Sequence, residues 1–216
     1  MLNNIASVAT SYLLRIKRSV AFFKENPSRF SIRHCFLVLA IASLSGCGSI
    51  SAVKSFWTTY QAPESGPRAK IRVISTGMVR AVPESNCIDW RKAGAGVMVS
   101  AQKVYSNLNG QSLDMPKRRN GYLLPADGEI QMSELYISAK GPLTLYLMGA
   151  GYDSGGKIRS CQRAVSFVPE SGKNYDAVLT EHGRNCLIQV DELDAVGDFE
   201  SVPLQNAGLC NVLDNF

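Results

Sequence analysis

The stretch Leu143-Thr144-Leu145-Tyr146-Leu147-Met148 decides the fold class. Its leucines recur at every second position, which is the period of a β-strand, because successive side chains of a strand point to opposite faces of the sheet. The other face, formed by Thr144, Tyr146 and Met148, is only half polar. We therefore expect this strand to lie in the middle of a sheet.

The same period of two extends from this stretch toward both ends of the chain. Alternate side chains are apolar or cysteine in 69–73, 97–101, 135–137, 161–167 (with Arg163 as the exception), 175–179 and 186–190. In 97–101 they place Val97 and Val99 on one face. Turn dipeptides such as Asn109-Gly110 separate these segments. Helical spacing is confined to one turn near Pro203–Ala207. About eight strands with hairpin spacing predict an all-β fold, an antiparallel β-sandwich over 68–216.

Charge is unevenly distributed along the chain. The 216 residues carry a formal charge of +5, with 23 basic and 18 acidic residues. Six of the basic residues and a single acid, Glu25, lie in 1–46, so 17 of each kind remain in 47–216. A neutral domain lacks the broad basic surface that neutralises phosphates in nucleic-acid binders. Nucleic acid is therefore not expected as a partner.

The first 46 residues have the features of an export signal. A short apolar run over 35–43 follows Arg33-His34 and ends at Leu44-Ser45-Gly46-Cys47. This run is too short to span roughly 30 Å of hydrocarbon, but it fits the apolar region of a signal peptide. Leu44-Ser45-Gly46-Cys47 resembles the lipobox of bacterial lipoproteins at every position. The resemblance implies cleavage before Cys47 by signal peptidase II and acylation of the Cys47 thiol.

This resemblance also implies where the protein resides. Gly48 follows the acylated cysteine, and by analogy with the sorting rule of Gram-negative lipoproteins a residue other than Asp there implies the outer membrane. We thus expect a signal peptide over 1–46, a lipidated Cys47 with a tether over 47–67, and the sandwich beyond. The alternative is an uncleaved inner-membrane anchor. The long segment before the apolar run is either a membrane-surface helix or the product of an over-long predicted start.

Four cysteines remain in the predicted domain: Cys87, Cys161, Cys186 and Cys210. An even number of dispersed cysteines on an exported domain predicts two disulfides, and the alternative is four free thiols. Three connectivities are possible, of which Cys87–Cys161 with Cys186–Cys210 is preferred because the second bond would hold the C-terminal tail. Zinc is not expected, since ligand spacing is absent and His182 is the only histidine beyond the signal.

Four short motifs stand out, and each has a structural interpretation. Asp153-Ser154-Gly155-Gly156 resembles the nucleophile loop of chymotrypsin-like proteases, yet a hairpin turn is the better account. Five acids over 191–200 only loosely match a calcium loop and are expected to form a solvated loop. The cluster Lys117-Arg118-Arg119 could meet lipid phosphate or another anion, although an exposed charged loop is favoured. Cys87-Ile88-Asp89-Trp90 is expected to place Trp90 in the core.

The sequence therefore predicts a binding or scaffolding module rather than an enzyme. We expect no catalytic residue, no metal and no cofactor, because His182 is the only predicted domain residue with an unperturbed pKa near neutrality and lies in a His-Gly turn. The expected partners are the membrane, through the lipid on Cys47, and a protein of the cell envelope on the periplasmic side. The alternative is an envelope enzyme or enzyme inhibitor whose site is built from loop residues.

Overall fold

The computed structural model describes residues 53–124, 129–153 and 155–211. The chain divides into two compact units, Met1–Gly46 and Cys47–Phe216, and the first lies wholly outside the described residues. The predicted signal peptide, Cys47, the start of the tether, Asp127-Gly128 and Ser154 also lie outside them. All described residues belong to the second unit.

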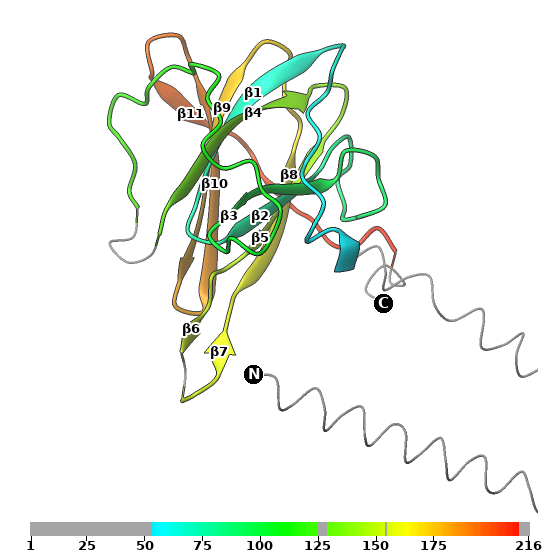
Figure 1. Cartoon of the computed structure of the whole chain (residues 1–216). Coiled ribbons are helices and arrows are strands. Elements are labelled where there is room, and N and C mark those ends of the chain that lie inside the picture. Colours follow the sequence, from blue (N-terminus) through cyan, green and yellow to red (C-terminus); the bar gives the residue numbers. More distant parts are fainter. Residues whose placement is uncertain (1–52, 125–128, 154, 212–216) are drawn as a thin grey trace, which may run out of the picture. The chain divides into compact units, whose positions relative to one another are not determined.

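Two five-stranded sheets form the domain, as predicted for a β-sandwich (Figure 1). The first sheet has the order β11-β10-β9-β1-β4 and contains β1 (Arg68–Ser75), β4 (Gln131–Ser138), β9 (Asn174–His182), β10 (Asn185–Leu193) and β11 (Phe199–Ser201). The second has the order β12-β8-β5-β2-β3 and contains β2 (Met78–Val82), β3 (Gly96–Ser100), β5 (Leu143–Met148), β8 (Gln162–Phe167) and β12 (Gln205–Asn206). A separate ribbon joins β6 (Tyr152–Asp153) to β7 (Ile158–Arg159). All pairings are antiparallel except β1 with β9.

The core lies between the facing sheets and consists of the alternate residues that the period of two selects. β5 contributes Leu143, Leu145 and Leu147, all buried, and it lies between β8 and β2 as expected for an interior strand. The first sheet contributes side chains from β1, β4, β9 and β10: Ala69, Ile71, Val73, Leu135, Ile137, Tyr175, Ala177, Leu179 and Val190. Burial of these faces supplies the main driving force for folding.

Three local expectations were wrong. The strand β2 was missed, and Gln205–Asn206 forms β12 against β8 where a helical turn was expected. In β3 the register shifts opposite Val79 and Arg80, and this irregularity brings Met98 into the core beside Val99. A bulge of this kind interrupts the alternation that placed Val97 and Val99 on one face.

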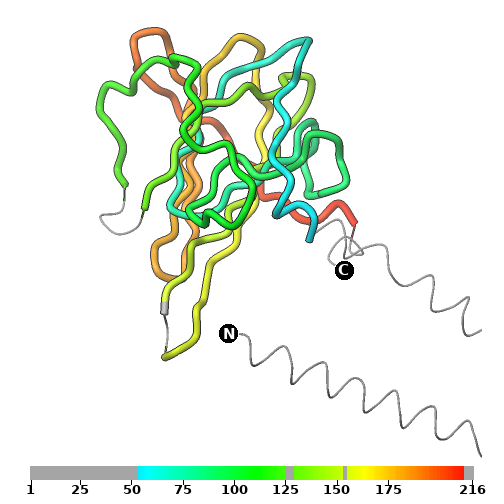
Figure 2. The backbone as a smooth tube through the Cα atoms, in the orientation of Figure 1, coloured from blue at the N-terminus to red at the C-terminus, as the bar shows by residue number. Residues whose placement is uncertain are grey.

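Irregular segments cover the outer faces of both sheets. The segment between β3 and β4 runs outside the first sheet (Figure 2). In this segment the carbonyls of Met115 and Pro116 accept hydrogen bonds from Arg72 of β1. The predicted tether docks on the domain, because Thr58 and Tyr60 exchange backbone hydrogen bonds with Val97 of β3. Tyr60 of this tether is buried in the core.

The four cysteines form two disulfides as predicted, but the preferred pairing was wrong. The bonds are Cys161–Cys186 and Cys87–Cys210, with Cα–Cα distances of 5.6 and 5.0 Å. Cys161 precedes β8 and Cys186 lies in β10, so the two inward-facing sulfurs meet between the sheets. The segment after β12 returns Cys210 to the loop between β2 and β3, where Cys87 lies.

Candidate functional site

The candidate site is built around Arg80, which lies in β2 on the outer face of the second sheet. Register places Arg80 directly opposite Tyr146 of β5, and Tyr146 opposite Ala164 of β8. These three side chains therefore form a row across the sheet, on the face that points away from the leucines of β5. Sequence reasoning missed this site because it missed β2.

Three aromatic rings enclose the Arg80 guanidinium. Its Cζ atom lies 3.9 Å from the centroid of Trp90, 4.1 Å from that of Phe56 and 4.7 Å from that of Tyr146. Trp90 and Tyr146 also meet edge to face at 5.6 Å. Arg80 is consequently only 4% exposed, and the electron-rich ring faces attract its charge.

No carboxylate pairs with Arg80 among the described residues. Its Nη1 donates a hydrogen bond to Ser55 Oγ at 2.5 Å, while its Nε is buried without a hydrogen-bond partner in the described part of the chain. Burial lowers the pKa of Arg80 to about 10, against a smaller opposing effect of Tyr146, so the side chain stays charged at neutral pH. A buried charge without an opposite charge is costly, and the aromatic faces offset part of that cost.

A pocket of about 540 Å³ opens beside this arginine, which is one of its lining residues. We call it the Arg80 pocket. Besides Phe56, Trp90 and Tyr146, its lining comes from three sources: Met148 of β5, Gln162 to Ala164 of β8, and Ile88 with 207–209 from the two segments next to the Cys87–Cys210 disulfide. Arg163 is exposed and adds a second cation to the lining.

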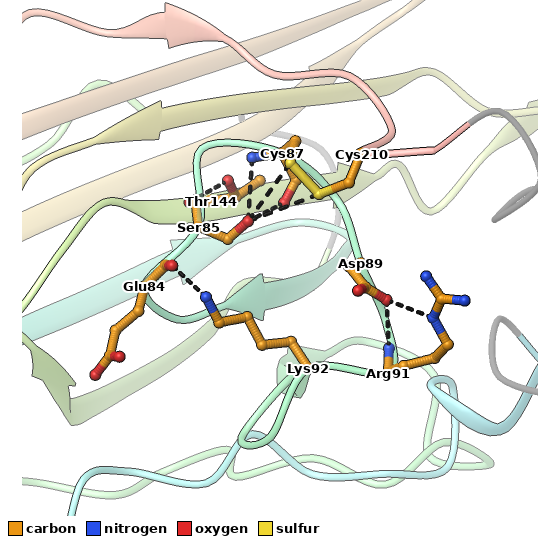
Figure 3. The surroundings of a disulfide bond; sticks show 8 residues. All are labelled: Glu84, Ser85, Cys87, Asp89, Arg91, Lys92, Thr144 and Cys210. Atoms are coloured by element: carbon orange, nitrogen blue, oxygen red, sulfur yellow. Dashed lines mark hydrogen bonds and ion pairs between the residues drawn. A yellow bond between two sulfur atoms is a disulfide. The ribbon is translucent and has the colours of Figure 1, made fainter.

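The Cys87–Cys210 disulfide holds two walls of the Arg80 pocket together. Ile88 and Leu209 form an isolated β-bridge, in which Ile88 N donates to Gly208 O at 2.8 Å and Cys210 N donates to Ile88 O at 3.1 Å. Figure 3 shows Ser85 against the disulfide, where its Oγ lies 3.7 and 3.8 Å from the two sulfurs. The disulfide thus fixes the loop that carries Trp90 against the C-terminal segment.

A second group of buried charges lies on the outer face of the first sheet. We call it the charged row. Register places Glu134, Arg72, Asp176 and Asp191 side by side on β4, β1, β9 and β10. Arg72 donates to Glu134 at 2.7 Å and to Asp176 at 3.0 Å. The period of two had assigned Arg72 to a solvent-facing position, but the segment between β3 and β4 covers it.

The acidic and basic motifs meet in this charged row, contrary to the expectation of two solvated loops. Arg118 pairs with Asp191 at 2.6 Å, with both side chains buried, and its Cζ lies 3.5 Å from the centroid of Phe199. Arg119 pairs with Asp198 at 3.0 Å at an exposed position. Two of the three basic residues therefore bind acids of the same chain instead of presenting their charges to an anion.

The charged row contains groups with shifted pKa values, as an active site often does. Burial raises the pKa of Asp176 and raises that of Tyr122, whose hydroxyl donates to Asp176, to about 12. The pKa of Glu134 is lowered: burial opposes this, but hydrogen bonds from Leu113 N, Arg72 and Met115 N outweigh it. These groups bind one another and the covering segment, so the row acts as a structural network.

The remaining predicted motifs have local structural roles. His182 is exposed at the end of β9, opposite Asn185 in the hairpin turn before β10. Gly155 and Gly156 have φ values of 64° and 77° between β6 and β7, which confirms a hairpin turn there. Trp90 is half-buried against Arg80 and does not lie in the core cluster, so that expectation was wrong.

Within 53–124, 129–153 and 155–211, no three His, Cys, Asp or Glu side chains are placed to hold a metal ion. A search of the same residues finds no helix with the length and apolar character needed to cross a membrane. Comparison with known proteins gives no match to a family, to a curated protein or to a solved structure.

Proposed function

We propose that this protein is an outer-membrane lipoprotein, anchored by lipid on Cys47, whose domain acts by binding on the periplasmic side. The lipobox resemblance of Leu44-Ser45-Gly46-Cys47 supports the anchor. The Cys87–Cys210 and Cys161–Cys186 disulfides support an oxidising compartment such as the periplasm. A diacylated cysteine would hold the domain close to the membrane because two acyl chains give stable anchoring.

The observation that carries the binding role is the Arg80 pocket. It combines a buried cation, a second cation at Arg163 and aromatic walls held by a disulfide, which are features of a preformed recognition site. The charged row, in contrast, has its polar groups bonded to one another under a covering segment. A cell-envelope partner or ligand held at the pocket is therefore the function that we propose.

The anchor is tested by metabolic labelling with radioactive palmitate in a Gram-negative host. The unaltered chain should incorporate label and fractionate with the outer membrane, because the Cys47 thiol accepts the diacylglycerol. Cys47→Ser should abolish labelling, whereas the control Cys35→Ser should keep it, because Ile32-Arg33-His34 before Cys35 does not match a lipobox. Persistent labelling of Cys47→Ser would refute acylation at this cysteine.

A further inference from the structure

We infer that the Arg80 pocket binds a small amphipathic anion, a carboxylate or phosphate head carried on an apolar body. This inference rests on the binding role proposed above, for which it names the ligand class, but it does not require the lipid on Cys47. A chain that fails to be acylated can still bind such an anion. The two proposals therefore fail in different experiments.

Two buried arginines of the same domain, Arg72 and Arg80, differ in whether they have carboxylate partners among the described residues. Arg72 is 5% exposed and donates to two carboxylates, to the Tyr122 hydroxyl and to two backbone carbonyls. Arg80 is 4% exposed and donates to Ser55, with no carboxylate partner in the described part of the chain. The chain thus supplies opposite charges where an arginine serves the fold. An anion at Arg80 would supply the charge that is missing there.

The Arg80 guanidinium does not use all of its hydrogen-bond donors within the described part of the chain. The Nε atom is buried and has no partner among the described residues. A planar guanidinium is suited to carboxylate and phosphate groups because its N–H donors match their oxygen spacing. The rings of Phe56 and Trp90, whose centroids lie 4.1 and 3.9 Å from Arg80 Cζ, hold the guanidinium in place. An anion that enters the pocket would therefore meet a fixed donor.

The rest of the pocket lining combines apolar and polar surface. Met148, Ile88 and Leu209 offer apolar surface, while Gln162 and Arg163 offer polar groups. The volume of about 540 Å³ lies in the range of roughly 300–1,000 Å³ that is typical of small-molecule sites. Because Arg80 is almost fully buried, a small head group can reach it more readily than a flat protein or membrane surface. A small amphipathic anion fits all of these features.

The test uses tryptophan emission of the full chain, purified in a non-ionic detergent. The chain has two tryptophans, and Trp57→Phe leaves Trp90, whose ring lies 3.9 Å from the Arg80 guanidinium, as the single reporter. Octanoate is the probe, and 1-octanol is the matched neutral compound with the same chain length. Octanoate should bind roughly tenfold or more tightly than 1-octanol, because a charged partner strengthens a hydrogen bond.

Arg80→Met, made in the Trp57→Phe background, should weaken octanoate binding roughly tenfold or more and leave 1-octanol binding unchanged. Arg68→Met is the matched control. Arg68 is an exposed arginine of β1 in the first sheet, stacked on Tyr136 of the neighbouring strand β4. Uptake of probe by micelles is the same for all variants, so it cancels when variants are compared with one probe. Octanoate and 1-octanol differ in this uptake, so their affinities are compared at free-probe concentrations measured by equilibrium dialysis. A soluble short-chain phosphatidylglycerol, titrated in parallel, distinguishes a phospholipid head from a free fatty acid as the better ligand.

Three results would overturn the inference. These are equal binding of octanoate and 1-octanol, unchanged octanoate binding in Arg80→Met, and no binding of either octanoate or the short-chain phosphatidylglycerol. The first and third need no substitution at Arg80, so the test stands even where Arg80→Met does not fold. Thermal unfolding of Arg80→Met and Arg68→Met establishes that a loss of binding is not a loss of structure.

Discussion

Arg72 of β1 and Glu134 of β4 lie directly opposite each other and form a buried ion pair, in which Arg72 Nη2 and Nε lie 2.7 and 3.0 Å from Glu134 Oε1. The other carboxylate oxygen of Glu134 accepts hydrogen bonds from the backbone N–H groups of Leu113 and Met115, at 2.6 and 3.2 Å. Glu134 therefore ties the segment between β3 and β4 to the sheet as well as neutralising Arg72.

Glu134→Gln should lower the free energy of unfolding by about 2 kcal/mol, because Arg72 loses one of its two carboxylate partners and the N–H groups of Leu113 and Met115 lose a charged acceptor. Urea denaturation measures this change. Glu129→Gln is the matched control at an exposed position, and it should change stability by less than about 0.5 kcal/mol. Equal stability of the two variants would show that the Arg72–Glu134 pair contributes nothing to the fold.

The same carboxylate should give the protein part of its acid sensitivity. The pKa of Glu134 is lowered in the fold, although burial opposes the shift, because Leu113 N, Arg72 and Met115 N stabilise its charge. Its contribution is therefore complete above its ordinary value of 4.5 and is lost as pH falls through the lower folded value. Between these values the stability of Glu134→Gln should fall less steeply than that of the unaltered protein, as measured by urea denaturation across a pH series.

Arg118→Met should lower the free energy of unfolding by about 3 kcal/mol or more, since it leaves the buried carboxylate of Asp191 without its cation. Lys117→Met, at the exposed neighbouring residue, should change it by less than about 0.5 kcal/mol. Combining Arg118→Met with Asp191→Leu should restore much of the loss, because an apolar pair can replace a buried ion pair. Equally small effects of Arg118→Met and Lys117→Met would instead favour the exposed-loop interpretation of this basic motif.

Peptide mapping without reduction should identify Cys161–Cys186 and Cys87–Cys210. In the chain-entropy description, loss of Cys161–Cys186, whose separation is 25 residues, should lower the free energy of unfolding by roughly 3 kcal/mol. Loss of Cys87–Cys210, with a separation of 123, should lower it by roughly 5 kcal/mol. Paired Cys→Ala variants compared by urea denaturation test this order, and a peptide containing Cys87 joined to Cys161 would contradict the pairing itself.

The period of two predicted the fold class because it reports which side chains enter the core. Leu143, Leu145 and Leu147 are buried as that pattern requires, and so are the inward residues of β1 and β9. The pattern says nothing about which strands become neighbours, so the parallel pairing of β1 with β9 could not be derived. For the same reason no pattern along the chain selects one of the three disulfide connectivities.

The candidate site was less accessible to prediction, because its residues look like surface residues in the sequence. Arg72 and Arg80 occupy polar positions between apolar ones, which is typical of the solvent face of a strand. Segments distant along the chain then cover these faces, so Arg80 meets Phe56 and Trp90, and Arg72 meets Tyr122. Burial of this kind depends on where irregular segments lie, and no local pattern records that.

Glu181 and His182 are neighbours at the end of β9, yet their substitution should have very different effects. Glu181 Oε1 accepts a hydrogen bond from Cys161 N at 2.9 Å, and its Oε2 accepts one from Gly151 N at 2.8 Å. Glu181→Ala would leave both N–H groups without this acceptor and should lower the free energy of unfolding by about 2 kcal/mol. Urea denaturation measures the loss.

His182→Ala should change the free energy of unfolding by less than about 0.5 kcal/mol, because the imidazole is exposed in a turn. It should also leave octanoate binding at the Arg80 pocket unchanged, since His182 does not line that pocket. Tryptophan emission and urea denaturation provide the two measurements. A His182→Ala protein that stays folded and anchored but loses its biological activity would contradict the binding-module proposal, because that loss would indicate an acid–base role for the imidazole.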